Sequence, residues 1–146
     1  MYCRMSHTKL TNQVAIITGS TGGMGEGIAR RLAADGAAVV ISGRRVDHGQ
    51  RIAESIALTG ARAIFIKADV AVEADCSNLI QSTLDHFERA DILVNNAAAT
   101  PPEPAGEQSA ELWDQVFAVN TRGAFLCCRE VIPAMRPPPS SLSERM

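Results

Sequence analysis

Short, mostly apolar runs alternate with longer amphipathic segments along most of the chain, and this alternation restricts the fold more than any other feature. The runs predict four buried strands, at residues 13–18, 37–42, 61–67 and 91–94. The segments that follow them carry apolar residues at helical spacing and predict helices at residues 23–35, 46–58, 73–88 and 109–135. Strands that are apolar on both faces need helices on both sides of their sheet. The sequence therefore predicts an α/β fold with a doubly wound parallel sheet.

A glycine-rich segment follows the first predicted strand directly and leads into the first predicted helix. It reads TGSTGGMG over residues 18–25. Gly19 permits a tight turn, Gly23 lets the backbone approach a pyrophosphate, and Gly25 allows close packing of helix against strand. The free N–H groups and the positive dipole end of the helix favour phosphate binding. The alternative is a glycine-rich turn without a ligand, but the strand–turn–helix context favours a dinucleotide.

Composition excludes several other classes of protein. The net charge of −2 over 146 residues argues against a large basic surface for nucleic acid. No apolar run is long enough for a membrane helix or a secretory signal, so we expect a protein of the cytoplasm with no membrane partner. The spacing of the four cysteines fits no metal site, and we interpret them as reduced thiols: Cys3, Cys76, Cys127 and Cys128.

Three further motifs follow the glycine-rich segment in order along the chain. They are Ala68-Asp69-Val70 after the third predicted strand, Asn95-Asn96-Ala97-Ala98 after the fourth, and Val119-Asn120-Thr121-Arg122-Gly123 within the last predicted helix. Together with the pattern TGxxxGxG, they resemble the motifs of the short-chain dehydrogenase/reductase family over about residues 8–136. The resemblance implies a Rossmann fold and an NAD(P)-dependent oxidoreductase that interconverts alcohols and carbonyls of small-molecule substrates. One departure is Ala98, which stands where the family usually has glycine.

The resemblance also implies a role for each motif. Asp69 and Val70 would contact the adenine, with an N-cap or loop role as the alternative for Asp69. Asn95 would bind the ribose or brace the neighbouring strands, and Asn120 would take the place of the family's catalytic asparagine. The alternative for Asn120 is a buried polar residue bonded to the backbone. The remaining predicted cofactor contacts are Gly19, Ser20, Thr21, Gly23, Met24, Gly25, Ala97 and Ala98.

The end of the second predicted strand bears on the choice of cofactor. NAD-specific sites of this kind place an acidic residue there to bind the ribose 2′-hydroxyl. This chain has Ser42, Gly43, Arg44 and Arg45 instead. The guanidinium of Arg44 fits a 2′-phosphate, so the sequence favours NADP(H) over NAD(H). If both arginines are merely solvated charges, the preference stays open.

The residues that the resemblance implies for hydride transfer are a serine, a tyrosine and a lysine four residues after the tyrosine. The only tyrosine is Tyr2, and no YxxxK is present. We therefore expect the N-terminal part of the fold, with impaired catalysis, or alternatively a non-catalytic module that binds dinucleotide or a partner subunit. The partner would be a second copy, packed through helix 109–135 as the resemblance implies.

The predicted organisation is one partial domain with a short segment on either side. Residues 1–12 form an extension, residues 13–136 form the NAD(P)-binding domain, and residues 137–146 form a disordered tail. The tail follows directly on a helical pattern and begins with three prolines, which cannot continue a helix or enter a central strand. The composition of this tail resembles that of an out-of-frame or spliced ending. The fourth strand should then have an unpaired edge.

Overall fold

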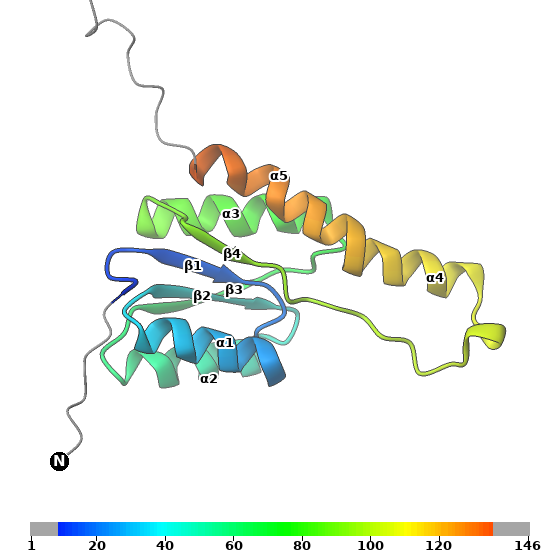
Figure 1. Ribbon diagram of the computed structural model, residues 1–146, viewed down its shortest axis with the longest axis horizontal. Helices are drawn as coiled ribbons and strands as arrows, with labels where there is room; N and C mark the ends of the chain where they lie inside the picture. Colours follow the sequence, from blue (N-terminus) through cyan, green and yellow to red (C-terminus); the bar gives the residue numbers. More distant parts are fainter. Residues whose placement is uncertain (1–8, 136–146) are drawn as a thin grey trace, which may run out of the picture.

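A four-stranded parallel sheet forms the centre of the computed structural model, which describes residues 9–135 (Figure 1). The strand order is β3-β2-β1-β4. In chain order the main elements are β1 (Val14–Ile17), α1 (Gly23–Ala34), β2 (Ala38–Gly43), α2 (Val46–Ala57), β3 (Ala63–Lys67), α3 (Glu73–Phe87), β4 (Ile92–Val94), α4 (Ala110–Phe117) and α5 (Ala124–Met135). The predicted α/β fold with a doubly wound parallel sheet is confirmed. The tail and residues 1–8 of the predicted extension lie outside the described residues, and the predicted domain bounds stay predictions.

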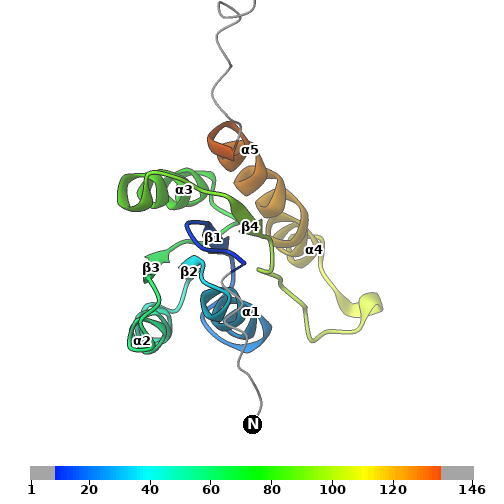
Figure 2. The same ribbon diagram turned by 60° about the vertical axis from the view of Figure 1, so that its left-hand side comes forward.

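Helices cover both faces of the sheet, and alternate residues of each strand supply the two cores. Figure 2 shows α1 and α2 on one face and α3 and α5 on the other. On β1, Ala15 and Ile17 pack toward α1 and α2, whereas Val14 and Ile16 pack toward α3 and α5. All four side chains are almost fully buried. This explains why the first strand is apolar at every position, as expected for a central parallel strand.

Asp91 joins the beginnings of the two neighbouring strands β1 and β4. Its carboxylate accepts the backbone N–H of Val14 at 2.8 Å and two hydrogen bonds from the guanidinium of Arg89, at 2.6 and 2.8 Å. The hydrogen bonds from Arg89 lower the pKa of Asp91 below its usual value. On its other side β4 pairs with no strand among residues 9–135, so the predicted open edge is present in the described fold.

The predicted helix over residues 109–135 is interrupted in the structure. A π-helical turn, Ala118–Gly123, separates α4 from α5. A Cβ atom at Gly123 would lie 2.9 Å from the backbone oxygen of Val70, so this turn approaches the end of β3 more closely than a side chain allows. The wide turn lets α4 extend beyond the sheet while α5 packs on α3 (Figure 1). It is also where Asn120 lies.

Candidate functional site

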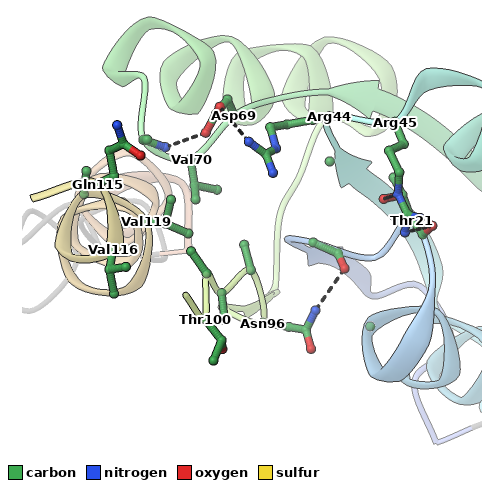
Figure 3. A pocket seen from close by; sticks show the side chains of 18 of the residues that line it. Thr21, Arg44, Arg45, Asp69, Val70, Asn96, Thr100, Gln115, Val116 and Val119 are labelled. Atoms are coloured by element: carbon green, nitrogen blue, oxygen red, sulfur yellow. Dashed lines mark hydrogen bonds and ion pairs between the residues drawn. The ribbon is translucent and has the colours of Figure 1, made fainter. Parts of the chain in front are cut away.

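A cleft of about 870 Å³ opens at the carboxyl ends of the strands. This is the edge at which doubly wound sheets bind their ligands. Its walls come from the glycine-rich turn after β1, the ends of β2 and β3, the segment after β4, and α4 with the π-helical turn (Figure 3). The lining residues include Gly19, Thr21, Gly22, Met24, Gly25, Gly43, Arg44, Arg45, Asp69, Val70, Asn96, Ala97, Ala98, Thr100, Leu112, Gln115, Val116 and Val119.

The glycine-rich turn meets the segment after β4 at van der Waals distance. Gly19 has φ +65°, and a Cβ atom there would lie 2.7 Å from the Cα of Ala97. Ser20 points the other way, since its hydroxyl donates to the carbonyl of Ile17 at 2.7 Å and accepts the N–H of Ser42 at 3.0 Å. Its side chain therefore ties the turn to β1 and β2, and Ser20 is not among the residues that line the cleft.

Thr18 connects the same two segments through its side chain. Its hydroxyl accepts the backbone N–H groups of Asn96 and Ala97, both at 3.1 Å, and donates to the carbonyl of Val94 at 3.3 Å. The Asn96 amide returns two hydrogen bonds, to the carbonyls of Thr18 at 2.9 Å and Gly19 at 3.1 Å. The turn and the end of β4 therefore form one hydrogen-bonded unit.

The two neighbouring asparagines of this motif have different partners. The sequence singled out Asn95 as a cofactor contact, but its amide donates to the sulfur of Cys128 on α5 at 3.3 Å. Asn95 does not line the cleft, whereas Asn96 does. Adjacent residues in an extended segment face opposite sides, so only one of the pair can reach the glycine-rich turn. The structure thus places Asn95 as the brace between β4 and α5.

An ion pair between Arg44 and Asp69 connects the ends of β2 and β3, which form one wall of the cleft. Arg44 Nη1 lies 3.9 Å from Asp69 Oδ2, and the Arg44 side chain is 76% exposed. Asp69 Oδ1 accepts the N–H of Ala71 at 3.0 Å, and the N–H of Asp69 donates to the Asp75 carboxylate at 2.8 Å. These bonds fix the Asp69 carboxylate at the rim, while a long, exposed ion pair leaves the guanidinium free to move.

Arg45 is an exposed residue whose guanidinium turns toward the glycine-rich turn. Its Nη2 donates to the backbone carbonyl of Thr21 at 2.7 Å. In the sequence, nothing but two consecutive arginines points to this contact. Of the other predicted contacts, Met24, Gly25, Val70, Ala97 and Ala98 line the cleft, whereas Gly23 does not.

The comparisons with known proteins agree with this geometry. A family model described as short chain dehydrogenase matches residues 13–141. The chain belongs to the short-chain dehydrogenase family. Relatives include the hydroxynaphthalene reductase-like protein Arp2 of Metarhizium acridum, 39% identical over 128 residues, which cover 87% of this chain and 48% of that protein. A 3-oxoacyl-(acyl-carrier-protein) reductase of Synechocystis is 37% identical over 129 residues, which cover 88% of this chain and 52% of that protein.

Solved structures give the same result. A dehydrogenase/reductase from Sinorhizobium meliloti has a TM-score of 0.85 and 32% identity over 90% of this chain and 52% of that one. A hydroxysteroid dehydrogenase from Escherichia coli has a TM-score of 0.84 and 29% identity over 89% of this chain and 55% of that one. The chain thus spans about half the length of the relatives that it matches.

Both ends of the Asn120 side chain form hydrogen bonds. Its Oδ1 accepts the N–H of Ala99 at 2.7 Å, and its Nδ2 donates to the carbonyl of Ala99 at 2.9 Å. The amide therefore ties the π-helical turn to the segment after β4. Asn120 is not among the cleft-lining residues. The structure thus has the backbone bonds of the alternative that the sequence left open, although Asn120 is exposed rather than buried.

Two free thiols, those of Cys76 and Cys127, lie buried behind the cleft. The Cys76 thiol donates to the carbonyl of Val70 at 3.4 Å, and Cys127 lies in the same buried cluster. Burial raises the pKa of Cys76 and raises that of Cys127 to about 12. Both thiols therefore stay protonated and pack as small apolar side chains.

Among residues 9–135, no group of three histidine, cysteine or acidic side chains is arranged to hold a metal ion. None of the helices described has the length and apolar character needed to cross a bilayer.

Proposed function

We propose that this chain forms the NADP(H)-binding part of an oxidoreductase that interconverts alcohols and carbonyls on small-molecule substrates. The observation that carries the proposal is the cleft itself. A glycine-rich turn at a helix N-terminus, an exposed arginine and a fixed carboxylate share its walls. The names of the relatives, among them reductases of ketoacyl groups and a hydroxysteroid dehydrogenase, support the reaction type.

The residues present fit a dinucleotide along the length of the cleft. Backbone at Gly19 and Gly25 approaches the cleft without side chains, which suits the pyrophosphate at the start of α1. The Asp69 carboxylate would accept from the adenine amino group beside Val70. We also propose that Ser20 and Gly23 support the turn. The proposed contacts in the lining of the cleft are Thr21, Met24, Ala97 and Ala98. The cofactor supplies hydride chemistry when bound, and these residues serve to hold it.

Arg44 favours NADP(H) in this proposal. Its guanidinium is largely exposed at the end of β2, where a cofactor 2′-phosphate would lie, and its ion pair with Asp69 is long at 3.9 Å. A forked, charge-assisted pair with phosphate is stronger than such an exposed ion pair. NAD(H) has no group to draw Arg44 away from Asp69, and it remains the alternative cofactor.

Binding without turnover is the behaviour that we propose for the 146-residue chain on its own. The sequence holds no YxxxK, and general acid catalysis needs such a group within hydrogen-bond reach of the reacting oxygen. Asn120 has both side-chain ends bonded to Ala99, so we assign it a positioning role. A cytoplasmic location is part of the proposal, since the three described cysteines, Cys76, Cys127 and Cys128, are free.

A second candidate function is that of a non-catalytic interaction module, favoured by exposed apolar side chains on α4 and α5. Trp113 stacks on Phe117 with 4.6 Å between the ring centroids, and Trp113 and Phe125 are 56% and 59% exposed. The proposed partner is a second copy of the chain. Sedimentation tests this, since Trp113→Glu should convert a dimer to a monomer. A monomeric unaltered chain would contradict it.

Calorimetric titration of the purified chain with NADPH and NADH tests the main proposal. We expect saturable binding of both, tighter for NADPH, and Arg44→Ala should weaken NADPH binding by about tenfold while leaving NADH binding unchanged. Arg51→Ala is the matched control, because Arg51 is an exposed arginine of α2 that bonds to Asp47 outside the cleft. A chain that is folded by circular dichroism and binds neither dinucleotide would refute the proposal.

A further inference from the structure

Two consecutive arginines diverge at the start of α2. Figure 3 shows Arg44 directed at Asp69 and Arg45 directed at Thr21. Arg45 Nη2 donates to the backbone carbonyl of Thr21 at 2.7 Å, and its Nε lies 3.4 Å from the Thr21 hydroxyl. The short bond to the carbonyl is charge-assisted and partly buried, which makes it one of the stronger single contacts in the cleft. Arg45 thus contacts the glycine-rich turn in space, although α1 and β2 separate the two in sequence.

The peptide that Arg45 holds is the one from which α1 starts. Gly22 is the N-cap residue of α1, and no side-chain hydrogen bond caps this helix. Its φ of +151° is a conformation that residues with a side chain rarely adopt, and a Cβ atom there would lie 2.8 Å from Arg45 Nη2. A peptide unit is planar, so a fixed carbonyl of Thr21 also fixes the direction of the Gly22 N–H. Arg45 therefore restricts the orientation of a peptide that the flexible glycines alone would not hold in place.

We propose that Arg45 is a positioning residue that holds the Thr21–Gly22 peptide in its phosphate-binding conformation before the cofactor arrives. Glycine-rich segments lose more conformational entropy on ordering than any others. A turn that is ordered in advance loses less of it on binding, and affinity rises accordingly. This inference rests on the proposed function. It gives the neighbouring residues Arg44 and Arg45 different roles. Arg44 distinguishes NADPH from NADH, whereas Arg45 favours both equally through the pyrophosphate that they share.

Titration of the variants with both dinucleotides separates the two roles. Arg45→Ala should weaken NADPH and NADH binding by the same factor, about tenfold, as expected for the loss of one charge-assisted hydrogen bond. Arg44→Ala should change the NADPH to NADH ratio. Arg45→Lys keeps the charge and one donor, so it should restore part of the loss for both. Arg51→Ala again serves as the control. A loss confined to NADPH in Arg45→Ala would overturn the proposal, because Arg45 would then contact the 2′-phosphate itself.

Amide hydrogen exchange of the cofactor-free chain gives a readout that does not depend on binding. In Arg45→Ala, exchange should become faster across residues 19–25 and stay unchanged in β3 and α3. In Arg44→Ala, exchange of residues 19–25 should match the unaltered chain. Unchanged exchange of the turn in Arg45→Ala would overturn the role of Arg45 whatever the titrations show. Absence of dinucleotide binding by the unaltered, folded chain would instead refute the proposed function, so the two failures are distinct.

Discussion

Replacement of Thr18 by valine tests how the glycine-rich turn is joined to the end of β4. Thr18 is 1% exposed, and its hydroxyl accepts two backbone N–H groups at 3.1 Å. Valine has nearly the same shape but no acceptor, so Thr18→Val leaves the N–H groups of Asn96 and Ala97 without this partner. At ~1 kcal/mol for each lost hydrogen bond, the free energy of unfolding should fall by about 2 kcal/mol. That is a large share of the stability of an ordinary domain.

Thermal unfolding followed by circular dichroism measures this loss. For a domain of this size the expected decrease in Tm is roughly 4–8 °C. Thr18→Ser is the control, because it keeps the hydroxyl and removes only a methyl group, and it should lose much less. If Thr18→Val unfolds at the temperature of the unaltered chain, or if Thr18→Ser loses as much, the hydroxyl does not connect the two segments as the structure indicates.

Three further predictions concern packing, pH and thiol reactivity. Gly49→Ala should lower the free energy of unfolding by about 1–3 kcal/mol, because its new methyl group would overlap the ring of Phe65. Gly27 lies on the exposed face of α1, where a Cβ atom meets nothing within 4 Å, so Gly27→Ala should raise the free energy of unfolding by about 0.5–1 kcal/mol. Urea unfolding compares the two variants. The pKa of Asp91 is lowered in the folded state, so its contribution to stability is present at neutral pH and is lost as the pH falls below about 4. Asp91→Asn should flatten this part of the stability–pH curve, and an unchanged curve would refute the ion pair's role. Cys127, with a pKa of about 12 and no exposed surface, should resist iodoacetamide at pH 8 until urea unfolds the chain, as peptide mass mapping would reveal. Labelling at the rate of an exposed thiol would contradict the buried position.

The regular part of the fold could be predicted from the sequence because its signals are local. The first apolar run predicted a strand at residues 13–18, and β1 spans Val14–Ile17. The π-helical turn could not be found in the same way. It depends on Gly123 packing against Val70 and on Asn120 bonding to Ala99, and neither partner is close in sequence.

The candidate site was predictable in outline, but the direction of individual side chains was not. The glycine-rich motif located the turn correctly, since strand, turn and helix follow one another directly in sequence. The choice between Asn95 and Asn96 depends on which of the two side chains points toward the glycine-rich turn, and a shift of one residue reverses it. Arg45 carries no motif of its own. Its contact with Thr21 arises only when β1 and β2 lie side by side.

The sheet order implies a sequence of events during folding. β1 pairs with β2, its neighbour along the chain, but the link between Val14 and Asp91 joins residues 77 positions apart. Long loops cost more entropy to close, so β1, β2 and β3 should assemble before β4 joins them. One wall of the cleft therefore forms early and the other late. A dinucleotide that contacts both walls should bind only after β4 has paired with β1. Bound dinucleotide should then stabilise this pairing, so the fraction of chains with β4 in place should rise with the cofactor concentration.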